Sequence, residues 1–432
     1  MKRLIYSDLL AWKNRTSRKP LIILGARQVG KTWIMQHFGE QEYESVAYIN
    51  CDDMPQAMDL FKTDYDMDRI LLAIQTITGV KVLPGKTLII LDEIQEVERG
   101  LHALKYFCEK IPEYHVMVAG SLLGITLKRG ESFPVGKVDI LNMYPMNFSE
   151  FLEAMGKPEL NDAILSCQWE SLKMMSSQYE HMLRQYYYVG GMPNVVKGYV
   201  EHRDIKEVRR EQLAIIESYR RDISKHTTSR ESIRIGQVLS SLPSQLAKEN
   251  KKFIYGAIRK GARAVDFELA IQWLIDAGIT HLVPRVSAAK PPLNFYASLD
   301  AFKMFLLDCG LLGCMADAPP TDMLIDNKVF TEFKGAFTEQ FVAQELISMG
   351  KKPYYWSNDR TPAEIDFIIQ DKGVITPIEV KASTNVRSKS LAQFIKDNEG
   401  LKGLRLSLLP YCDQEWMENI PLYALRGLFS KS

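Results

Sequence analysis

The chain has 432 residues, of which 46% are hydrophobic and 25% charged, and its formal net charge is +1. This length is more than one hydrophobic core supports and predicts about three domains, while the composition is ordinary for a globular protein. The near-zero charge excludes a surface that attracts polyanions everywhere, so any nucleic-acid contact would be a local patch.

The cysteines and the lengths of the apolar runs indicate in which cellular compartment the protein is expected. The six cysteines form no Cys-x-x-Cys pair, and we interpret them as reduced thiols. The sequence begins Met-Lys-Arg-Leu-Ile-Tyr-Ser-Asp, which places charge before any apolar stretch of signal length. No apolar run reaches the length of a membrane span. These features predict a cytoplasmic protein with no membrane partner.

The first motif follows an apolar strand at residues 21–24. Residues 25–32 have the pattern Gly-x-x-x-x-Gly-Lys-Thr. Glycines let the backbone wrap so that amides point at phosphate oxygens, and a helix that begins near Lys31 adds its positive dipole end. Lys31 would reach the terminal phosphates and Thr32 would ligate Mg²⁺, unless the pattern is a chance glycine turn. The candidate cofactor-binding residues here are Gly25, Ala26, Arg27, Gln28, Val29, Gly30, Lys31, Thr32 and Trp33.

A second strand, at residues 87–91, ends in Asp92 and Glu93. Its continuous apolar character predicts a strand buried on both faces, as in a parallel sheet. Carboxylates at the C-terminal end of such a strand would lie beside the phosphate loop. Asp92 would then hold Mg²⁺, and Glu93 would orient the attacking water or accept its proton. The alternative is an ordinary charged strand end.

A third apolar strand, at residues 114–119, runs into Gly120 and Ser121. Ser121 is positioned either to contact the γ-phosphate or simply to close the strand with a turn. Lys31, Glu93 and Ser121 are therefore the candidate catalytic residues.

Four segments occur in a characteristic order: residues 25–32, Leu-Asp-Glu-Ile-Gln at 91–95, Ala-Gly-Ser-Leu-Leu at 119–123 and Tyr-Pro-Met-Asn-Phe-Ser-Glu-Phe at 144–151. In this order the chain resembles prokaryotic AAA-type ATPases that carry a C-terminal DUF4143-like domain of unknown function. The resemblance extends over essentially the whole chain and implies ATP and Mg²⁺ as cofactors. Spacing alone leaves GTP open, although no Asn-Lys-x-Asp motif is present.

From about residue 150 to 230 the apolar spacing of three and four predicts helices. Glycines and a proline interrupt them at residues 190–193. The resemblance to signalling-type ATPases implies that Gly191 and Pro193 contact the nucleotide base, whereas the alternative is a helix that stops and restarts. An arginine near the γ-phosphate is also expected. The candidates are Arg129, Arg184, Arg220 and Arg221.

Residues 233–286 have the pattern of a winged helix, with three short helices and a following strand. The third helix, at 265–277, would be the reader of a DNA groove. It carries Asp266, Glu268 and Asp276 and no basic residue, so phosphates would repel it. We therefore favour a packing element or a nucleotide-driven lever. Basic residues that precede this helix leave a nonspecific backbone contact open: Lys248, Lys251, Lys252, Arg259, Lys260 and Arg263.

The last segment contains a spaced set of charged residues. Glu339 lies near the start of a predicted helix, Asp366 lies on one predicted strand, and Glu379 and Lys381 lie on the next. Side chains two residues apart on a strand share a face, so Glu379 and Lys381 would point into one site. This arrangement resembles the PD-(D/E)xK nucleases.

The nuclease resemblance implies that Asp366 and Glu379 are metal ligands, that Lys381 is the charge partner and that Glu339 is an outer helper. Basic residues farther along the chain could supply phosphate contacts: Arg387, Lys389 and Lys396. The alternative is a nuclease fold without cleavage, in which the polar cluster survives as a salt bridge.

These patterns together predict an α/β multidomain chain. Residues 1–152 would be a P-loop AAA-type ATPase domain with a parallel sheet, and 153–230 a helical lid. Residues 231–318 would be a winged-helix domain, and 319–432 a restriction-endonuclease-like α/β domain.

The expected function is Mg²⁺-dependent ATP hydrolysis that controls the C-terminal domains. The alternatives are an ATP-regulated DNA nuclease and a non-hydrolysing nucleotide switch or interaction scaffold. DNA and a protein partner are candidate partners beside ATP, and the sequence does not fix the oligomeric state.

Overall fold

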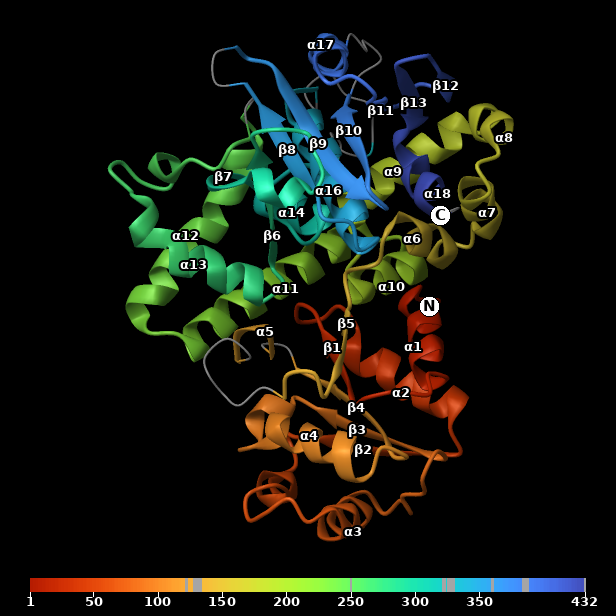
Figure 1. Cartoon of the computed structure of the whole chain (residues 1–432), viewed down its shortest axis with the longest axis vertical. Helices are drawn as coiled ribbons and strands as arrows, with labels where there is room; N and C mark the ends of the chain where they lie inside the picture. The colour runs from red at the N-terminus through yellow and green to blue at the C-terminus, as the bar shows by residue number, and fades with distance from the viewer. Residues whose placement is uncertain are drawn as a thin grey trace. The chain divides into compact units, whose positions relative to one another are not determined.

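The computed structural model describes residues 1–120, 123–126, 134–248, 251–320, 324, 331–358, 361–382 and 388–430. The chain forms two compact units (Figure 1). Residues 2–144 and 276–278 make up the first, here called the N-terminal unit. Residue 1 and residues 145–275 and 279–432 make up the second, the C-terminal unit.

The N-terminal unit is built on a five-stranded sheet in the order β2-β3-β4-β1-β5, and all paired strands are parallel. This confirms the predicted parallel sheet. The strands are β1 (Leu21–Leu24), β2 (Ser45–Asn50), β3 (Thr87–Asp92), β4 (His115–Ala119) and β5 (Asp139–Asn142). The helices are α1 (Ile5–Lys13), α2 (Lys31–Glu42), α3 (Met67–Thr78), α4 (Gly100–Lys110) and α5 (Leu123–Thr126).

Burial of the central strands explains their composition. Every residue of β3 and β4 is buried, as expected for strands covered on both faces. Ile89 and Leu91 of β3 belong to one hydrophobic cluster with Leu104 and Phe107 of α4. The cluster fixes β3 in the sheet, and with it the position of the carboxylates at its C-terminal end.

The C-terminal unit begins with helices, as the apolar spacing predicts. They are α6 (Phe148–Ala154), α7 (Pro158–Leu165), α8 (Trp169–Met174), α9 (Ser176–Val189), α10 (Pro193–His202), α11 (Ile205–His226), α12 (Ser229–Leu246) and α13 (Ala264–Asp276). Side chains set several of their starts. Asn147 and Glu150 form a capping box at α6, and Thr228 and Glu231 form another at α12. None of the described helices is both long and apolar enough to cross a bilayer.

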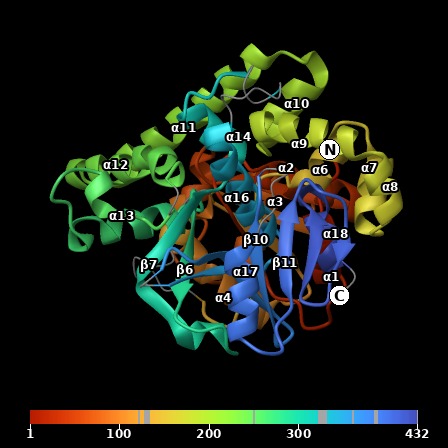
Figure 2. The same cartoon turned by 90° about the horizontal axis from the view of Figure 1, so that it is seen from above.

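An eight-stranded mixed sheet follows, in the order β12-β13-β11-β10-β9-β8-β6-β7. Its strands are β6 (Thr280–Val286), β7 (Ala297–Leu306), β8 (Tyr354–Ser357), β9 (Glu364–Asp371), β10 (Val374–Val380), β11 (Gly403–Ser407), β12 (Cys412–Asp413) and β13 (Met417–Pro421). The accompanying helices are α14 (Cys309–Met315), α16 (Thr331–Ser348), α17 (Lys389–Asp397) and α18 (Leu425–Ser430). Figure 2 shows this sheet from above.

The sheet crosses the boundary predicted at residue 319. The antiparallel pair β6–β7 precedes that residue, yet β6 also pairs in parallel with β8 through Arg285 and Tyr355. The predicted winged-helix and nuclease-like segments therefore share a sheet and are not separate compact units here.

The predicted winged-helix segment also differs in its helices. The second of the three is only a 3-10 helix, Tyr255–Ala257, and this stretch contains Gly256 and Gly261, which disfavour a longer helix. Helices α12 and α13 lie side by side in both views (Figures 1 and 2). An ion pair of 3.3 Å joins Arg234 to Asp266, so one of the acidic groups of the third helix is neutralised.

A close backbone crossing explains the glycines that interrupt the helices. The Gly191 N–H donates to Asp308 Oδ2 at 2.5 Å, and the Met146 N–H donates to the Gly191 carbonyl at 2.7 Å. A Cβ atom on Gly191 would lie 1.9 Å from the Met146 carbonyl oxygen. Pro193 is the first residue of α10, where its missing N–H costs no helix bond.

Gly191→Ala should therefore destabilise the protein, by about 1–3 kcal/mol or more, because backbone atoms must move apart. Gly198→Ala is the matched control, since this helical glycine has no atom within 4 Å of an added Cβ. It should leave stability unchanged or raise it by up to about 1 kcal/mol. Thermal and urea unfolding of the full chain measure both effects. Equal stabilities of the two variants would contradict the close approach of the Gly191 and Met146 backbones.

Candidate functional site

The loop between β1 and α2 reverses the chain within a few residues. Gln28 and Gly30 have φ values of 66° and 96°, in the left-handed region. A Cβ atom on Gly25 would lie 2.2 Å from the Met143 carbonyl oxygen, so only glycine fits there. The loop thus has the tight wrapping that the sequence predicts, and it ends where α2 begins at Lys31.

Lys31 is folded across this loop and is only 7% exposed. Its Nζ donates to the carbonyls of Gly25 at 2.9 Å and Ala26 at 2.8 Å. Burial lowers the pKa of Lys31 to about 8, although the nearby charges of Glu93 and Asp92 act to raise it. A phosphate would give this ammonium a stronger acceptor than the neutral carbonyls it now contacts.

Thr32 and Asp92 lie in contact, although 60 residues separate them. The Thr32 hydroxyl donates to Asp92 Oδ2 at 2.6 Å, and the Tyr48 hydroxyl donates to the same oxygen at 3.3 Å. Asp92 is 4% exposed, and this burial raises its pKa against the hydrogen bond from Thr32. A hydroxyl and a carboxylate side by side are oxygen donors of the kind that Mg²⁺ prefers, so the residues present fit this ion.

Glu93 occupies a strained position directly after β3. Its φ of 51° is unusual for a residue with a side chain. Gln95 Nε2 donates to Glu93 Oε2 at 2.6 Å, which orients the carboxylate. The other end of Gln95 lies against Gly120, directly after β4, where an added Cβ atom would be 1.9 Å from Gln95 Oε1. That buried oxygen has no hydrogen-bond partner within the described part of the chain.

Arg3 is a residue of this site that sequence reasoning missed. It is 7% exposed, and its guanidinium donates to the Val29 carbonyl at 2.9 Å and the Tyr144 carbonyl at 2.7 Å. It therefore ties the phosphate loop to the chain that follows β5. No motif marks it, since an arginine ahead of a helix is ordinarily a surface residue.

The other residues predicted for this site are less constrained. Trp33 is 44% exposed and stacks on His37, with ring centroids 4.7 Å apart. Ser121 and Arg129 lie outside the described residues. Arg184 and Arg220 pair with neighbouring glutamates on their own helices, and Arg221 is exposed. Gly191 and Pro193 belong to the C-terminal unit, and their role at a nucleotide base stays a prediction.

The charged residues of the predicted nuclease-like site do converge in the C-terminal unit. Asp366 Oδ2 accepts the Val380 N–H at 2.7 Å, and Lys381 pairs with the buried Glu379 at 2.6 Å. Glu339 is also buried, at 6% exposure. Arg387 lies outside the described residues.

Two lysines that the sequence did not place here enter this cluster. Lys303 of β7 is fully buried, and its Nζ is 3.3 Å from Glu339, 4.0 Å from Asp366 and in an ion pair with Glu364. Lys251 Nζ is 2.6 Å from Glu339. Lys251 was expected on a basic surface but is buried, because its ammonium is drawn to this carboxylate.

The cluster perturbs its members strongly. Burial alone would lower the pKa of Lys303, but Glu339, Glu364 and Asp366 raise it above its ordinary value. Burial and the charge of Glu339 raise the pKa of Asp366 to about 7. Within the described residues no group of three or more His, Cys, Asp and Glu side chains could hold a metal ion. The Lys303 ammonium lies 4.0 Å from Asp366, one of the two predicted metal ligands. The metal role of Asp366 and Glu379 stays a prediction.

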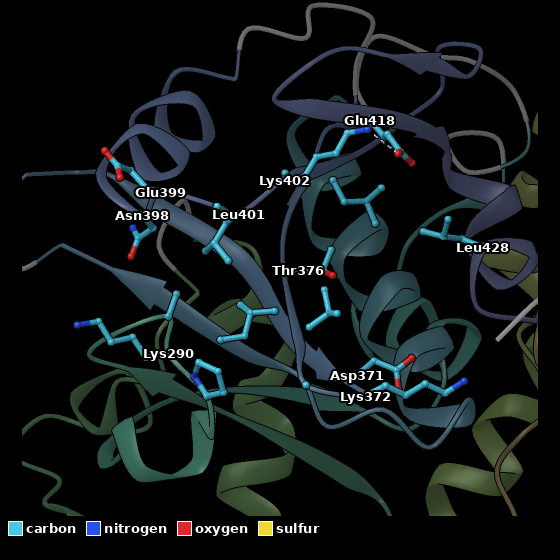
Figure 3. Close-up of a pocket in the computed structure, with 18 of the residues that line it drawn as sticks. Lys290, Asp371, Lys372, Thr376, Asn398, Glu399, Leu401, Lys402, Glu418 and Leu428 are labelled. Atoms are coloured by element: carbon cyan, nitrogen blue, oxygen red, sulfur yellow. Dashed lines mark hydrogen bonds and ion pairs between the residues drawn. The ribbon is translucent and has the colours of Figure 1, made fainter.

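A pocket of about 960 Å³ lies elsewhere in the C-terminal unit (Figure 3). The turn between β9 and β10, with Asp371 and Lys372, forms one side, and residues 397–404 form another. Lys402 is neutralised there by Asp413 and Glu418. None of the predicted site residues lines the pocket, and its mixed charges point to no single class of ligand.

The parallel sheet, the phosphate loop and the carboxylates at the end of β3 together define a P-loop NTPase-like N-terminal domain. Residues 17–152 match the family model of an AAA domain. Residues 180–322 and 334–421 match two domains of unknown function, DUF8612 and DUF4143. The matches to the AAA domain and to DUF4143 confirm those two parts of the resemblance stated from the sequence.

No curated protein matches the chain. Among solved structures, a Walker-type ATPase of Pyrococcus abyssi is 13% identical, with 73% of this chain and 95% of that chain covered at a TM-score of 0.45. The ORC1 protein of Aeropyrum pernix, solved in complex with DNA, is 12% identical, with 74% and 92% covered at a TM-score of 0.25. We draw no conclusion from these similarities because both TM-scores lie below 0.5.

Arg3→Met should lower the free energy of unfolding by about 1–3 kcal/mol, because two backbone carbonyls lose their charged donor. Arg15→Met is the matched control, since Arg15 is 51% exposed and pairs only at the surface with Asp139. It should cost less than about 1 kcal/mol. Urea unfolding followed by circular dichroism measures the free energy of unfolding of both variants. If the Arg3 variant were as stable as the Arg15 variant, the contacts of Arg3 with the two carbonyls would not stabilise the protein.

Proposed function

We propose that the protein binds ATP with Mg²⁺ at the loop of residues 25–32 and hydrolyses it, and that nucleotide state controls the C-terminal unit. The observation that carries the proposal is the 2.6 Å contact between Thr32 and Asp92 beside the Lys31 ammonium. The match of residues 17–152 to an AAA domain supports ATP as the nucleotide.

Each residue of the loop region has a role in this proposal. The backbone amides of the loop and Lys31 would bind the β- and γ-phosphates, with Lys31 exchanging the carbonyls of Gly25 and Ala26 for phosphate oxygens. Thr32 and Asp92 would hold Mg²⁺, which when bound neutralises charge on the phosphates. The exposed indole of Trp33 is a candidate contact for the nucleotide at the start of α2.

Glu93 would act on the water that attacks the γ-phosphate. Its backbone conformation and the hydrogen bond from Gln95 hold the carboxylate in one direction, so little reorganisation is needed when the water arrives. Glu93 would orient that water and accept its proton. In the same proposal Ser121 would contact the γ-phosphate, and Gly191 and Pro193 would contact the nucleotide base.

Lys31→Ala should weaken ATP binding at least about tenfold, because a charge-assisted phosphate contact is lost. Glu93→Gln should keep the affinity and lose about 10²–10⁴-fold in hydrolysis, since the amide cannot accept the proton. Lys86→Ala, which removes a surface lysine paired with Glu44, is the control and should change neither. Titration calorimetry and phosphate release measure these effects, and unchanged turnover in Lys31→Ala would refute the proposal.

ATP affinity should also depend on pH through Lys31. In the free protein its pKa is about 8, below the ordinary value because of burial, whereas a bound phosphate would raise it again. Only the ammonium form binds phosphate well, so affinity should be constant below the free pKa and fall above it, by up to about tenfold per pH unit. Binding above that pKa should take up close to one proton.

Calorimetry in buffers of different ionisation enthalpy measures this uptake. Lys86→Ala should retain it. A pH-independent affinity between roughly pH 7 and 9.5, with no proton taken up, would contradict the role of Lys31.

A further inference from the structure

The cluster around Lys303 gathers several charged side chains in the C-terminal unit. Its ammonium is fully buried beside carboxylates from two elements: Glu339 of α16 and Glu364 and Asp366 of β9. The aromatic rings of Tyr355 and Phe367 lie 5.1 and 5.9 Å from Nζ. The ammonium is thus enclosed by oxygen atoms and ring faces, as a bound cation would be.

The ammonium groups and the carboxylates of the cluster neutralise one another. An isolated buried ammonium is very costly, and so are like-charged carboxylates held together away from water. Lys303 and Glu339 are buried, and Glu364 and Asp366 are partly buried, so each charge is tolerated because the opposite charge is present. Lys251 adds a second cation at Glu339, from the segment that precedes α13. Three carboxylates therefore share two ammonium groups.

A divalent metal would compete with Lys303 for the same place. Mg²⁺–oxygen bonds are about 2.0–2.1 Å long, and Lys303 Nζ is already 3.3 Å from Glu339 and 4.0 Å from Asp366. An ion bound to these oxygens would lie within a few ångströms of the ammonium, where like charges repel strongly in a buried setting. The two cations are mutually exclusive.

The other half of the predicted site, Glu379, is paired with a lysine of its own strand end. Glu379 contacts Lys381 through one oxygen, while its buried Oε2 has no hydrogen-bond partner among the described residues. Lys381 thus already balances the charge of Glu379, as Lys303 does for the carboxylates around it.

We infer that Lys303 takes the place of a divalent metal ion in the nuclease-like site. Glu339, Glu364 and Asp366 form a closed ion cluster with Lys303 and Lys251. The cluster binds neither Mg²⁺ nor Mn²⁺ and does not hydrolyse phosphodiesters. Its role is to fasten the β6–β7 hairpin to α16 and β9.

Metal-free stability tests the inference in a protein that keeps Lys303. Glu339→Gln should lower the Tm of the full chain in chelator by at least about 5 °C, because both lysines lose a charged partner. In an empty metal site the same change would relieve carboxylate repulsion and raise the Tm. Glu399→Gln, at an exposed glutamate of the same unit, is the control and should leave the Tm unchanged. A Tm of Glu339→Gln equal to or above that of the parent would overturn the inference.

Metal-binding measurements without nucleotide are a second, independent test of the inference. Electron paramagnetic resonance measures Mn²⁺ binding to the parent chain and to Asp366→Asn. The two proteins should bind the same amount of Mn²⁺, because Asp366 is not a metal ligand in the parent. Lys303→Met should gain one Mn²⁺ site at least tenfold tighter than any site in the parent, and Asp366→Asn should abolish that gain. Lys381→Met should gain none, because Lys303 is still in place.

Besides the stability result, two results with metal would overturn the inference. One is Mn²⁺ bound by the parent chain and lost in Asp366→Asn. The other is plasmid cleavage by the parent chain that depends on Mn²⁺ and on Asp366. If Lys303→Met does not fold, the measurements on the parent, Asp366→Asn and Glu339→Gln still decide the question. Because ATP is absent throughout, failure here is distinct from failure of the proposed ATPase.

Discussion

The contact between Thr32 and Asp92 depends on several independent features of the N-terminal unit. It requires the loop to reverse direction at Gly30 so that α2 starts with Lys31 and Thr32. It also requires β3 to end at Asp92, which the hydrophobic packing of the strand against α4 ensures. A parallel sheet places both chain segments at one edge, since strands that run the same way end on the same side. The hydrophobic core therefore positions Thr32 and Asp92, although neither residue belongs to it.

Much of this unit could be predicted because its signals are local. A continuous apolar run predicts a buried strand, and a glycine loop ahead of a helix requires only neighbouring residues. Both patterns placed Lys31, Thr32 and Asp92 correctly relative to the sheet. Arg3 was not predictable in the same way, because it donates to the carbonyls of Val29 and Tyr144, which come close to it only after folding.

The C-terminal unit shows where such reasoning stops. The strands with Asp366 and Glu379 follow the predicted alternation and pair as β9 and β10. Lys303, however, comes from a segment assigned to a different domain, and no spacing rule connects position 303 to position 366. A motif gives the residues of one chain segment that share a face. It does not reveal a side chain that enters from a distant segment and changes what the site can bind.

The shared sheet has a further consequence for how the chain can be divided. Strand β8 has the β6–β7 hairpin on one side, so a fragment that begins after residue 319 would leave an unpaired strand edge open to other copies. Such a fragment would also lack both lysines of the ion cluster and would carry Glu339, Glu364 and Asp366 with their charges uncompensated. Metal affinity or nuclease activity found in an isolated C-terminal fragment would thus describe the fragment and not the intact polypeptide.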